Sequence, residues 1–159
     1  VFVDATTYWG GSQFINSAGC GKYSDYILKD LFTAVQALLP VTTTTSQICV
    51  MGGSSGGYGA LALISEKNSP FGVAFATAPD SYFEASLLPE LFNAAPELLK
   101  YKNFAALKKM IDAGEIQDKK SFFNLANVVA MAHCYAPKKS FKKDFLEFPI
   151  DLHTGEINS

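Results

Sequence analysis

The stretch QICVMGGSSGGYGALAL, residues 47–63, decides how the rest of the sequence is interpreted. It opens on β-prone residues from Gln47 to Met51, continues through glycines and serines, and then favours a helix from about Gly56 to Lys67. A buried strand that turns into a helix over so many glycines indicates a turn with a specialised backbone rather than an ordinary surface loop.

The segments on either side of this stretch predict a parallel sheet. We expect a short buried strand at Val1–Asp4, a helix from about Ser24 to Leu39 that stops at Pro40, and another strand at Gly72–Ala78. Strands and helices that alternate at this spacing are typical of parallel βαβ units, so the expected fold class is α/β. The strands show no period-two pattern, which predicts that helices cover both faces of the sheet.

Beyond the third strand the pattern becomes entirely helical. Apolar residues at helical spacing predict one amphipathic segment that ends at Gly114 and a second that includes Phe122 and Val129. We expect residues 85–136 to form a helical, cap-like insertion within a single, partial domain that comprises residues 1–159.

The composition is that of a globular chain and excludes several classes of function. Of the 159 residues, 48% are hydrophobic and 18% are charged, and the net charge is −2. A nucleic-acid partner is not expected, because such proteins normally carry a strongly basic surface. All 13 cationic residues are lysines, and the lack of arginine weakens any proposal of bidentate phosphate recognition.

The cysteines and the absence of targeting signals predict the compartment. Cys20, Cys49 and Cys134 are odd in number and widely spaced, which predicts neither a disulfide framework nor a metal site, and no cofactor is expected. Cys49 and Cys134 are expected to be small buried hydrophobic residues. The sequence shows no signal peptide and no apolar run that could span a membrane, so we expect a cytoplasmic location and no membrane partner.

Three chemistries place glycines between a strand and a helix. A P-loop requires a lysine after its last glycine, and none follows here. A dinucleotide fingerprint, G-x-G-x-x-A, fits residues 57–62, with Asp80 near the end of the next strand, but Gly57 lies too far beyond Met51 to form the turn. The nucleophile elbow, G-x-S-x-G, fits best because it places a serine on a sharp turn between a strand and a helix.

The elbow motif occurs in two overlapping registers. Gly52–Gly56 would make Ser54 the nucleophile, and Gly53–Gly57 would make it Ser55. Ser55 is the predicted nucleophile because the residues after it are small enough for a close-packed helix. Ser54 would also leave little room for a turn after the strand.

Four segments of the sequence resemble those of a known family. VFVDATTYWGGSQFINS, CVMGGSSGGYGALAL, PFGVAFATAPDSYFE and FPIDLHTGEI are similar to segments of the esterase family of α/β-hydrolases that contains esterase D, enterochelin esterases and mycolyltransferases. The resemblance implies a partial α/β-hydrolase fold with Ser55 as the nucleophile and the backbone N–H of Gly56 in the oxyanion hole. It also implies that Trp9, Gly10, Gly11 and Tyr58 line the substrate pocket.

The resemblance also implies a catalytic acid and a catalytic histidine that act together with the serine. In the chain order of these hydrolases the acid and the histidine follow the serine after later strands, so we expect them outside this chain. His133 and His153 are not expected to act as the base. Asp80 and Glu84 follow the strand after the elbow helix, and we expect them to cap a turn or line the pocket.

These expectations define a serine hydrolase that acts on small-molecule carboxylic esters through an acyl-enzyme at Ser55. The chain is expected to be a fragment that is close to inactive alone, because a serine without a base is a weak nucleophile. Two alternatives stay open at this point: an acyltransferase that uses the same serine, and a non-catalytic α/β-hydrolase-like binding module.

Overall fold

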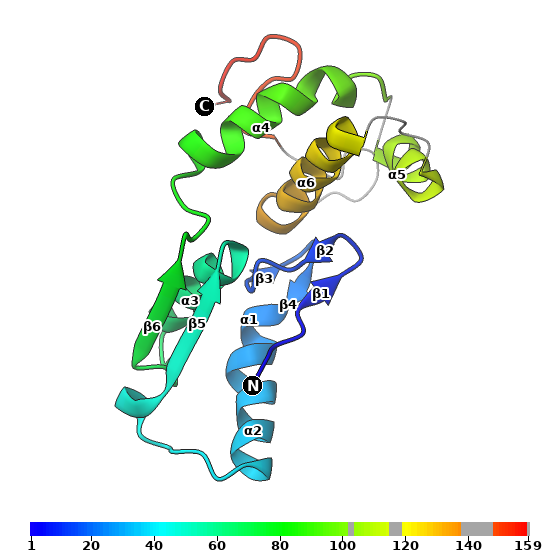
Figure 1. The fold of residues 1–159 in the computed structure, drawn as a ribbon. Helices are drawn as coiled ribbons and strands as arrows, with labels where there is room; N and C mark the ends of the chain where they lie inside the picture. Colours follow the sequence, from blue (N-terminus) through cyan, green and yellow to red (C-terminus); the bar gives the residue numbers. More distant parts are fainter. Residues whose placement is uncertain (102–103, 115–118, 138–147, 159) are drawn as a thin grey trace. The chain divides into compact units, whose positions relative to one another are not determined.

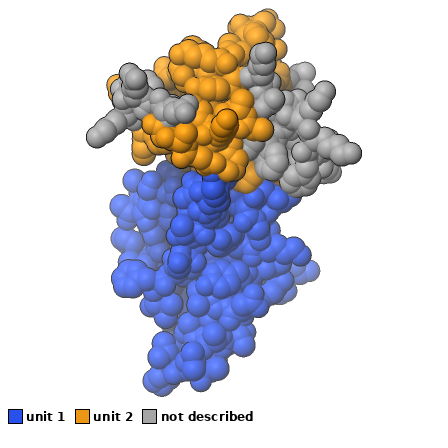
Figure 2. Space-filling model, turned by 90° about the vertical axis from the view of Figure 1, so that its right-hand side faces the viewer, with its two compact units in different colours: residues 1–81 blue, residues 82–159 orange. Residues whose placement is uncertain are grey.

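The computed structural model describes residues 1–101, 104–114, 119–137 and 148–158 (Figure 1). The chain divides into two compact units, residues 1–81 and residues 82–159, which Figure 2 colours separately. Each unit contains buried apolar side chains, such as Ile27 and Leu63 in the first and Leu125 and Val129 in the second. Within the described ranges, no helix has the length and hydropathy needed to cross a bilayer.

A parallel strand–helix–strand unit organises the first part of the chain. Strands β5 (Cys49–Gly53) and β6 (Val73–Thr77) pair in parallel, from Cys49 opposite Val73 to Gly53 opposite Thr77. Helix α3 (Ser55–Ser65) connects them and packs on both strands. The predicted βαβ order is therefore confirmed at this point, and the carboxyl ends of the strands meet at one edge.

The prediction that helices cover both faces of the sheet is wrong for the described residues. Side chains of β5 and β6 alternate between exposed and half-buried, because a pleated strand sends successive side chains to opposite faces. Helix α3 covers one face. On the other face Met51 is 71% exposed and Phe75 is 59% exposed.

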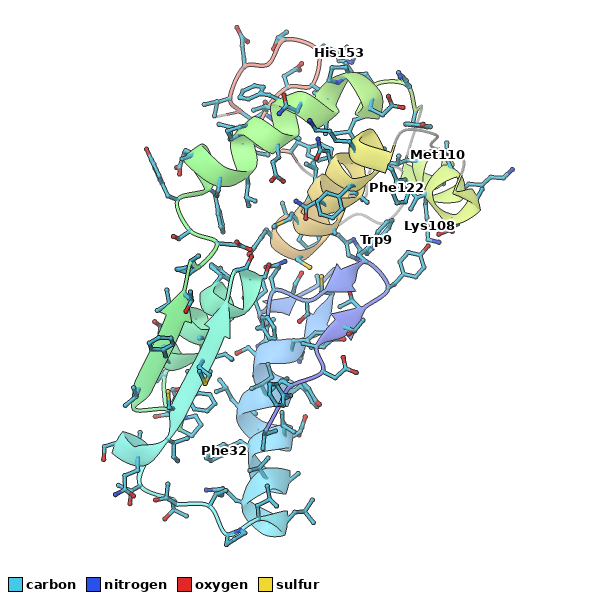
Figure 3. All side chains as sticks on the ribbon, in the orientation of Figure 1. Trp9, Phe32, Lys108, Met110, Phe122 and His153 are labelled. Atoms are coloured by element: carbon cyan, nitrogen blue, oxygen red, sulfur yellow. The ribbon has the colours of Figure 1, made fainter. Side chains whose placement is uncertain are left out.

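A second helical segment precedes the sheet. Its turns follow one another without a break as α1 (Tyr23–Asp25), a π-helical stretch η1 (Tyr26–Leu31) and α2 (Phe32–Leu38), close to the predicted helix. Leu39 is extended, as expected for the residue before a proline. Phe32 meets Phe71 edge to ring with the centroids 6.1 Å apart, and Figure 3 shows Phe32 projecting from α2. A short 3₁₀ turn, η2 (Thr45–Gln47), leads into β5.

The amino-terminal segment differs from its prediction. Val1–Asp4 is not a strand: no strand in the described part of the chain pairs with it, and the Phe2 side chain is fully exposed. The following loop instead forms two short antiparallel hairpins. Their strands are β1 (Thr6–Thr7) with β2 (Gly10–Gly11), and β3 (Asn16–Ser17) with β4 (Gly21–Lys22).

The corner between the two hairpins attaches them to α3. Gln13 and Phe14 both have positive φ, 55° and 59°, which L-residues adopt only where the surroundings hold them. The Phe14 ring lies against Gly59 so closely that a Cβ on Gly59 would be 2.5 Å from Phe14 Cδ2. The hairpins can therefore approach helix α3 at this position because Gly59 has no side chain.

The second unit is helical, as predicted. Helix α4 (Phe83–Leu98) packs on α6 (Lys119–Tyr135), and Asn127 Nδ2 donates a hydrogen bond of 2.6 Å to Glu90 Oε2 between them. Helix α5 (Phe104–Ala113) contributes the buried Leu107 and Met110. An isolated bridge between Ile150 and Ile157 closes the carboxyl-terminal turn. The cap-like role of these helices stays a prediction.

The cysteines do not all behave as expected. Cys134 is buried as predicted, whereas Cys49 is free and exposed on the open face of the sheet.

The contact between Phe14 and Gly59 predicts an asymmetric effect of two alanine substitutions in α3. Gly59→Ala should lower the free energy of unfolding by about 1–3 kcal/mol, because the new methyl group collides with the Phe14 ring and its Cβ. Gly56→Ala is the matched control: its Cβ meets nothing within 4 Å, and alanine should leave stability unchanged or raise it by about 0.5–1 kcal/mol. Urea unfolding followed by circular dichroism measures both, and equal effects would contradict the assigned contact.

Candidate active site

Ser54 has the most distinctive backbone conformation in the strand-to-helix turn. Its φ and ψ are 53° and −125°, a region that L-residues rarely occupy and that costs about 1–3 kcal/mol. It lies between Gly53, the last residue of β5, and Ser55, the first residue of α3. The turn position that the sequence assigned to Ser55 is thus occupied by Ser54.

Main-chain hydrogen bonds hold Ser54 in this conformation. Its N–H donates to the carbonyl of Thr77 at the end of β6, at 3.0 Å. Its carbonyl accepts from the N–H of Tyr58 at 3.0 Å and from the N–H of Asp80 at 3.3 Å. Both polar groups of this residue's backbone are therefore satisfied, by α3 on one side and by β6 and the segment after it on the other.

Two glycines near Ser54, Gly52 before it and Gly57 after it, leave no room for a side chain. A Cβ on Gly52 would lie 2.3 Å from both the carbonyl carbon and the carbonyl oxygen of Gly56, so these two residues must be in near contact. A Cβ on Gly57 would lie 3.1 Å from Pro79 Cα. A Cβ on Gly53, by contrast, would meet only the Thr77 carbonyl oxygen, at 3.8 Å. The close approach is centred on Ser54, which is the middle residue of Gly52-x-Ser54-x-Gly56.

The carboxylate of Asp80 joins the two serine side chains. Ser54 Oγ donates to Asp80 Oδ1 at 3.2 Å, and Ser55 Oγ donates to Asp80 Oδ2 at 2.7 Å. Asp80 reaches them because the chain turns after β6 at Ala78, which has a φ of 43°. The sequence placed Asp80 at the end of this strand but did not indicate that one carboxylate bridges both hydroxyls.

The amino terminus of α3 supplies hydrogen-bond donors beside Ser54. The first backbone N–H groups of a helix have no partner within the helix, and the helix dipole gives that end a partial positive charge. The N–H of Ser55 follows Ser54 directly, and that of Gly56 comes next. The Ser54 side chain is exposed while Ser55 is half-buried. This arrangement can present a hydroxyl to an acyl group and stabilise negative charge on its oxygen.

The predicted pocket residues lie in two elements of the same unit. Tyr58 is in the first turn of α3. Trp9 lies in the turn between β1 and β2 and contacts Tyr8 edge to face, with the ring centroids 4.9 Å apart, while Gly10 and Gly11 form β2 (Figure 3). Their contact with a substrate stays a prediction.

The histidines and Glu84 belong to the second unit, whereas Ser54 and Asp80 belong to the first. His133 is buried in α6, and His153 is exposed in the turn that follows Asp151 (Figure 3). The backbone N–H groups of Thr154 and His153 hold the pKa of the Asp151 carboxyl below its ordinary value. His153 therefore lies in a turn in which its own N–H and that of Thr154 donate to the Asp151 carboxylate.

The dinucleotide alternative does not fit the backbone. Its first glycine, Gly57, lies inside α3 and is buried against Pro79 rather than placed in the turn. The turn itself is occupied by Ser54, and a serine with this conformation between a parallel strand and a helix has the backbone geometry of a nucleophile elbow.

The fold and the turn together define the class of α/β-hydrolase-type serine hydrolases. The chain belongs to the prolyl oligopeptidase family, whose sequence model matches residues 7–121, more than half of the chain. Comparison with curated proteins gave no significant match. The predicted hydrolase class is thus confirmed, whereas the resemblance to the esterase D and enterochelin esterase branch is not.

The contact between Gly52 and Gly56 makes the elbow sensitive to a single methyl group. Gly52→Ala should destabilise the protein by at least about 1–3 kcal/mol, because the obstacle is backbone and cannot rotate away. Gly53→Ala, the adjacent control, should change stability by less than about 1 kcal/mol, since its Cβ has room. Thermal unfolding of the two variants checks this, and a Gly52→Ala variant as stable as Gly53→Ala would refute the described turn.

Proposed function

We propose that the protein is a serine hydrolase that acts on carboxylic esters through an acyl-enzyme on Ser54. The observation that carries this proposal is the conformation of Ser54, with φ 53° and ψ −125°. Strain of this size persists only where the surroundings impose it, and in hydrolases of this class it exposes the nucleophile. Membership of the prolyl oligopeptidase family supports the same reaction class.

Each part of the turn has a role in the proposed reaction. Ser54 Oγ attacks the acyl carbon, and the negative charge that develops on the carbonyl oxygen accepts a hydrogen bond from the N–H of Ser55. This donor replaces the N–H of Gly56, because the oxyanion donor is the residue directly after the nucleophile. The dipole of α3 favours the same charge.

Substrate binding and turnover are proposed to need further groups. Trp9, Gly10, Gly11 and Tyr58 are proposed to line the pocket for a small ester. The catalytic acid and histidine are expected later in the chain order of the family, and without them acyl transfer and deacylation are slow. The described chain alone is therefore proposed to acylate on Ser54 but to turn over poorly.

Peptide-bond hydrolysis is the second candidate, and the family match favours it specifically. The same serine and the same oxyanion donor would serve, since both reactions pass through an acyl-serine. An amide requires protonation of its leaving amine, whereas an activated ester does not. The two candidates therefore differ in how strongly they need a general acid.

Site mapping tests the nucleophile. A fluorophosphonate probe should modify Ser54, detected by mass spectrometry of the proteolysed protein at saturating probe. Ser54→Ala should abolish this modification because the strained, exposed hydroxyl is removed, whereas Ser55→Ala should retain a labelled Ser54. Labelling that survives Ser54→Ala and disappears in Ser55→Ala would restore the nucleophile that the sequence favoured.

Two chromogenic substrates separate the candidate functions. With p-nitrophenyl acetate we expect a burst of nitrophenol approaching one equivalent per protein, followed by a slow steady state, because acylation outpaces deacylation. With a prolyl-peptide aminocoumarin amide we expect at least about a hundredfold lower rate of acylation, since its amine leaves only when protonated. Amide cleavage that matches or exceeds ester cleavage, and that depends on Ser54, would favour the peptidase instead.

A further inference from the structure

We propose that Asp80 selects substrates by their charge: it favours acyl groups that carry a positive charge close to the carbonyl and disfavours those that carry a negative one. The inference rests on the proposed role of Ser54 and names the class of ester that this serine accepts best. Its basis is a carboxylate that lies beside the nucleophile and forms no ion pair within the described part of the chain.

Hydrogen bonds hold the Asp80 carboxylate at a fixed place beside Ser54. Oδ1 accepts a hydrogen bond from Ser54 Oγ at 3.2 Å, and Oδ2 accepts one from Ser55 Oγ at 2.7 Å. The backbone N–H of Asp80 also donates to the carbonyl of Ser54 at 3.3 Å. Ser54 is exposed and Asp80 is half-buried, so a substrate that reaches Ser54 Oγ also comes close to this carboxylate.

The charge of Asp80 has no cationic partner among the residues that the structure describes. Each ion pair found there joins two side chains three or four residues apart, and none includes Asp80. The side-chain partners of Asp80 are two serine hydroxyls, which carry no net charge. An aspartate carboxylate is ionised at neutral pH. An unneutralised negative charge therefore lies 3.2 Å from the proposed nucleophilic oxygen.

The acyl group of a substrate must come within range of this charge. In the acyl-enzyme the carbonyl carbon is bonded to Ser54 Oγ, and a cationic nitrogen on the next carbon lies two bonds further away. Covalent bonds of about 1.5 Å place such a nitrogen within roughly 4–7 Å of Asp80 Oδ1. Opposite charges at this separation change a rate by about threefold or more, even in a dielectric as high as that of water.

A purely structural role is the alternative for the same carboxylate. The amino terminus of a helix favours a negative charge, and Ser55, which donates to Asp80, is the first residue of α3. That role predicts that removal of the charge changes stability and affects all substrates equally. Selection by charge predicts instead that the ratio of rates between two substrates changes.

Two esters that match in shape and differ in charge test the inference. The acyl group of p-nitrophenyl trimethylammonioacetate carries a quaternary ammonium, and p-nitrophenyl tert-butylacetate has a carbon in place of that nitrogen. Acylation rates come from the nitrophenol burst, at ester concentrations far below saturation. The ratio of the cationic to the neutral rate should fall by at least about threefold in Asp80→Asn, which keeps the shape of the side chain and removes its charge.

Two variants and one change of solvent serve as controls. Asp30→Asn removes an exposed aspartate of η1, makes the same change in net charge, and should leave the ratio within about twofold of that of the unmodified protein. Asp80→Glu keeps a carboxylate and should give a higher ratio than Asp80→Asn. In the unmodified protein the ratio should also fall at about 1 M salt, where the screening length is about 3 Å.

The outcomes separate this inference from the proposed function. An Asp80→Asn ratio equal to that of the unmodified protein overturns selection by charge and leaves Ser54 as the proposed nucleophile. A ratio in the unmodified protein that high salt does not lower overturns it as well, and this measurement needs no variant to fold. Absence of a burst with both esters, together with absence of Ser54 labelling, overturns the proposed function and this inference with it.

Discussion

The near contact between the backbones of Gly52 and Gly56 is the constraint on which the site depends. The strand can turn into the helix within a single residue because Gly52 has no side chain to collide with the backbone of Gly56. That residue is Ser54, which therefore adopts a conformation that few L-residues tolerate. The backbone hydrogen bonds of Ser54 to Thr77, Tyr58 and Asp80 offset the strain and keep the hydroxyl exposed.

The same turn connects β5, α3 and the end of β6 through main-chain hydrogen bonds. In a parallel pair the carboxyl ends of both strands lie at the same edge, so the segment after β6 reaches the turn after β5. Pro79 can approach α3 because Gly57 has no side chain, and Asp80 then lies beside both serines. The chemistry of the site thus depends on the parallel topology as much as on the motif.

The sequence predicted local structure well where neighbouring residues alone determine the backbone conformation. The apolar runs and glycines of residues 47–78 predicted a strand, a helix and a second strand close to the observed β5, α3 and β6. The same reasoning failed at Val1–Asp4, since β-prone residues form a strand only where another strand offers hydrogen bonds. The prediction that helices cover both faces of the sheet also failed, because the coverage of each face depends on which other elements pack against it, and one face is exposed.

The sequence by itself determined the reaction class, because a glycine-flanked serine between a strand and a helix is a nucleophile elbow in either register. It could not decide the register, because Gly52–Gly56 and Gly53–Gly57 both satisfy the motif. Tertiary structure decided which serine occupies the turn: β5 continues to Gly53 and α3 begins at Ser55, so the single residue of the turn is Ser54. Only the folded chain brings Asp80 to both hydroxyls, because that meeting depends on the pairing of β5 with β6 and on the backbone hydrogen bonds between their ends.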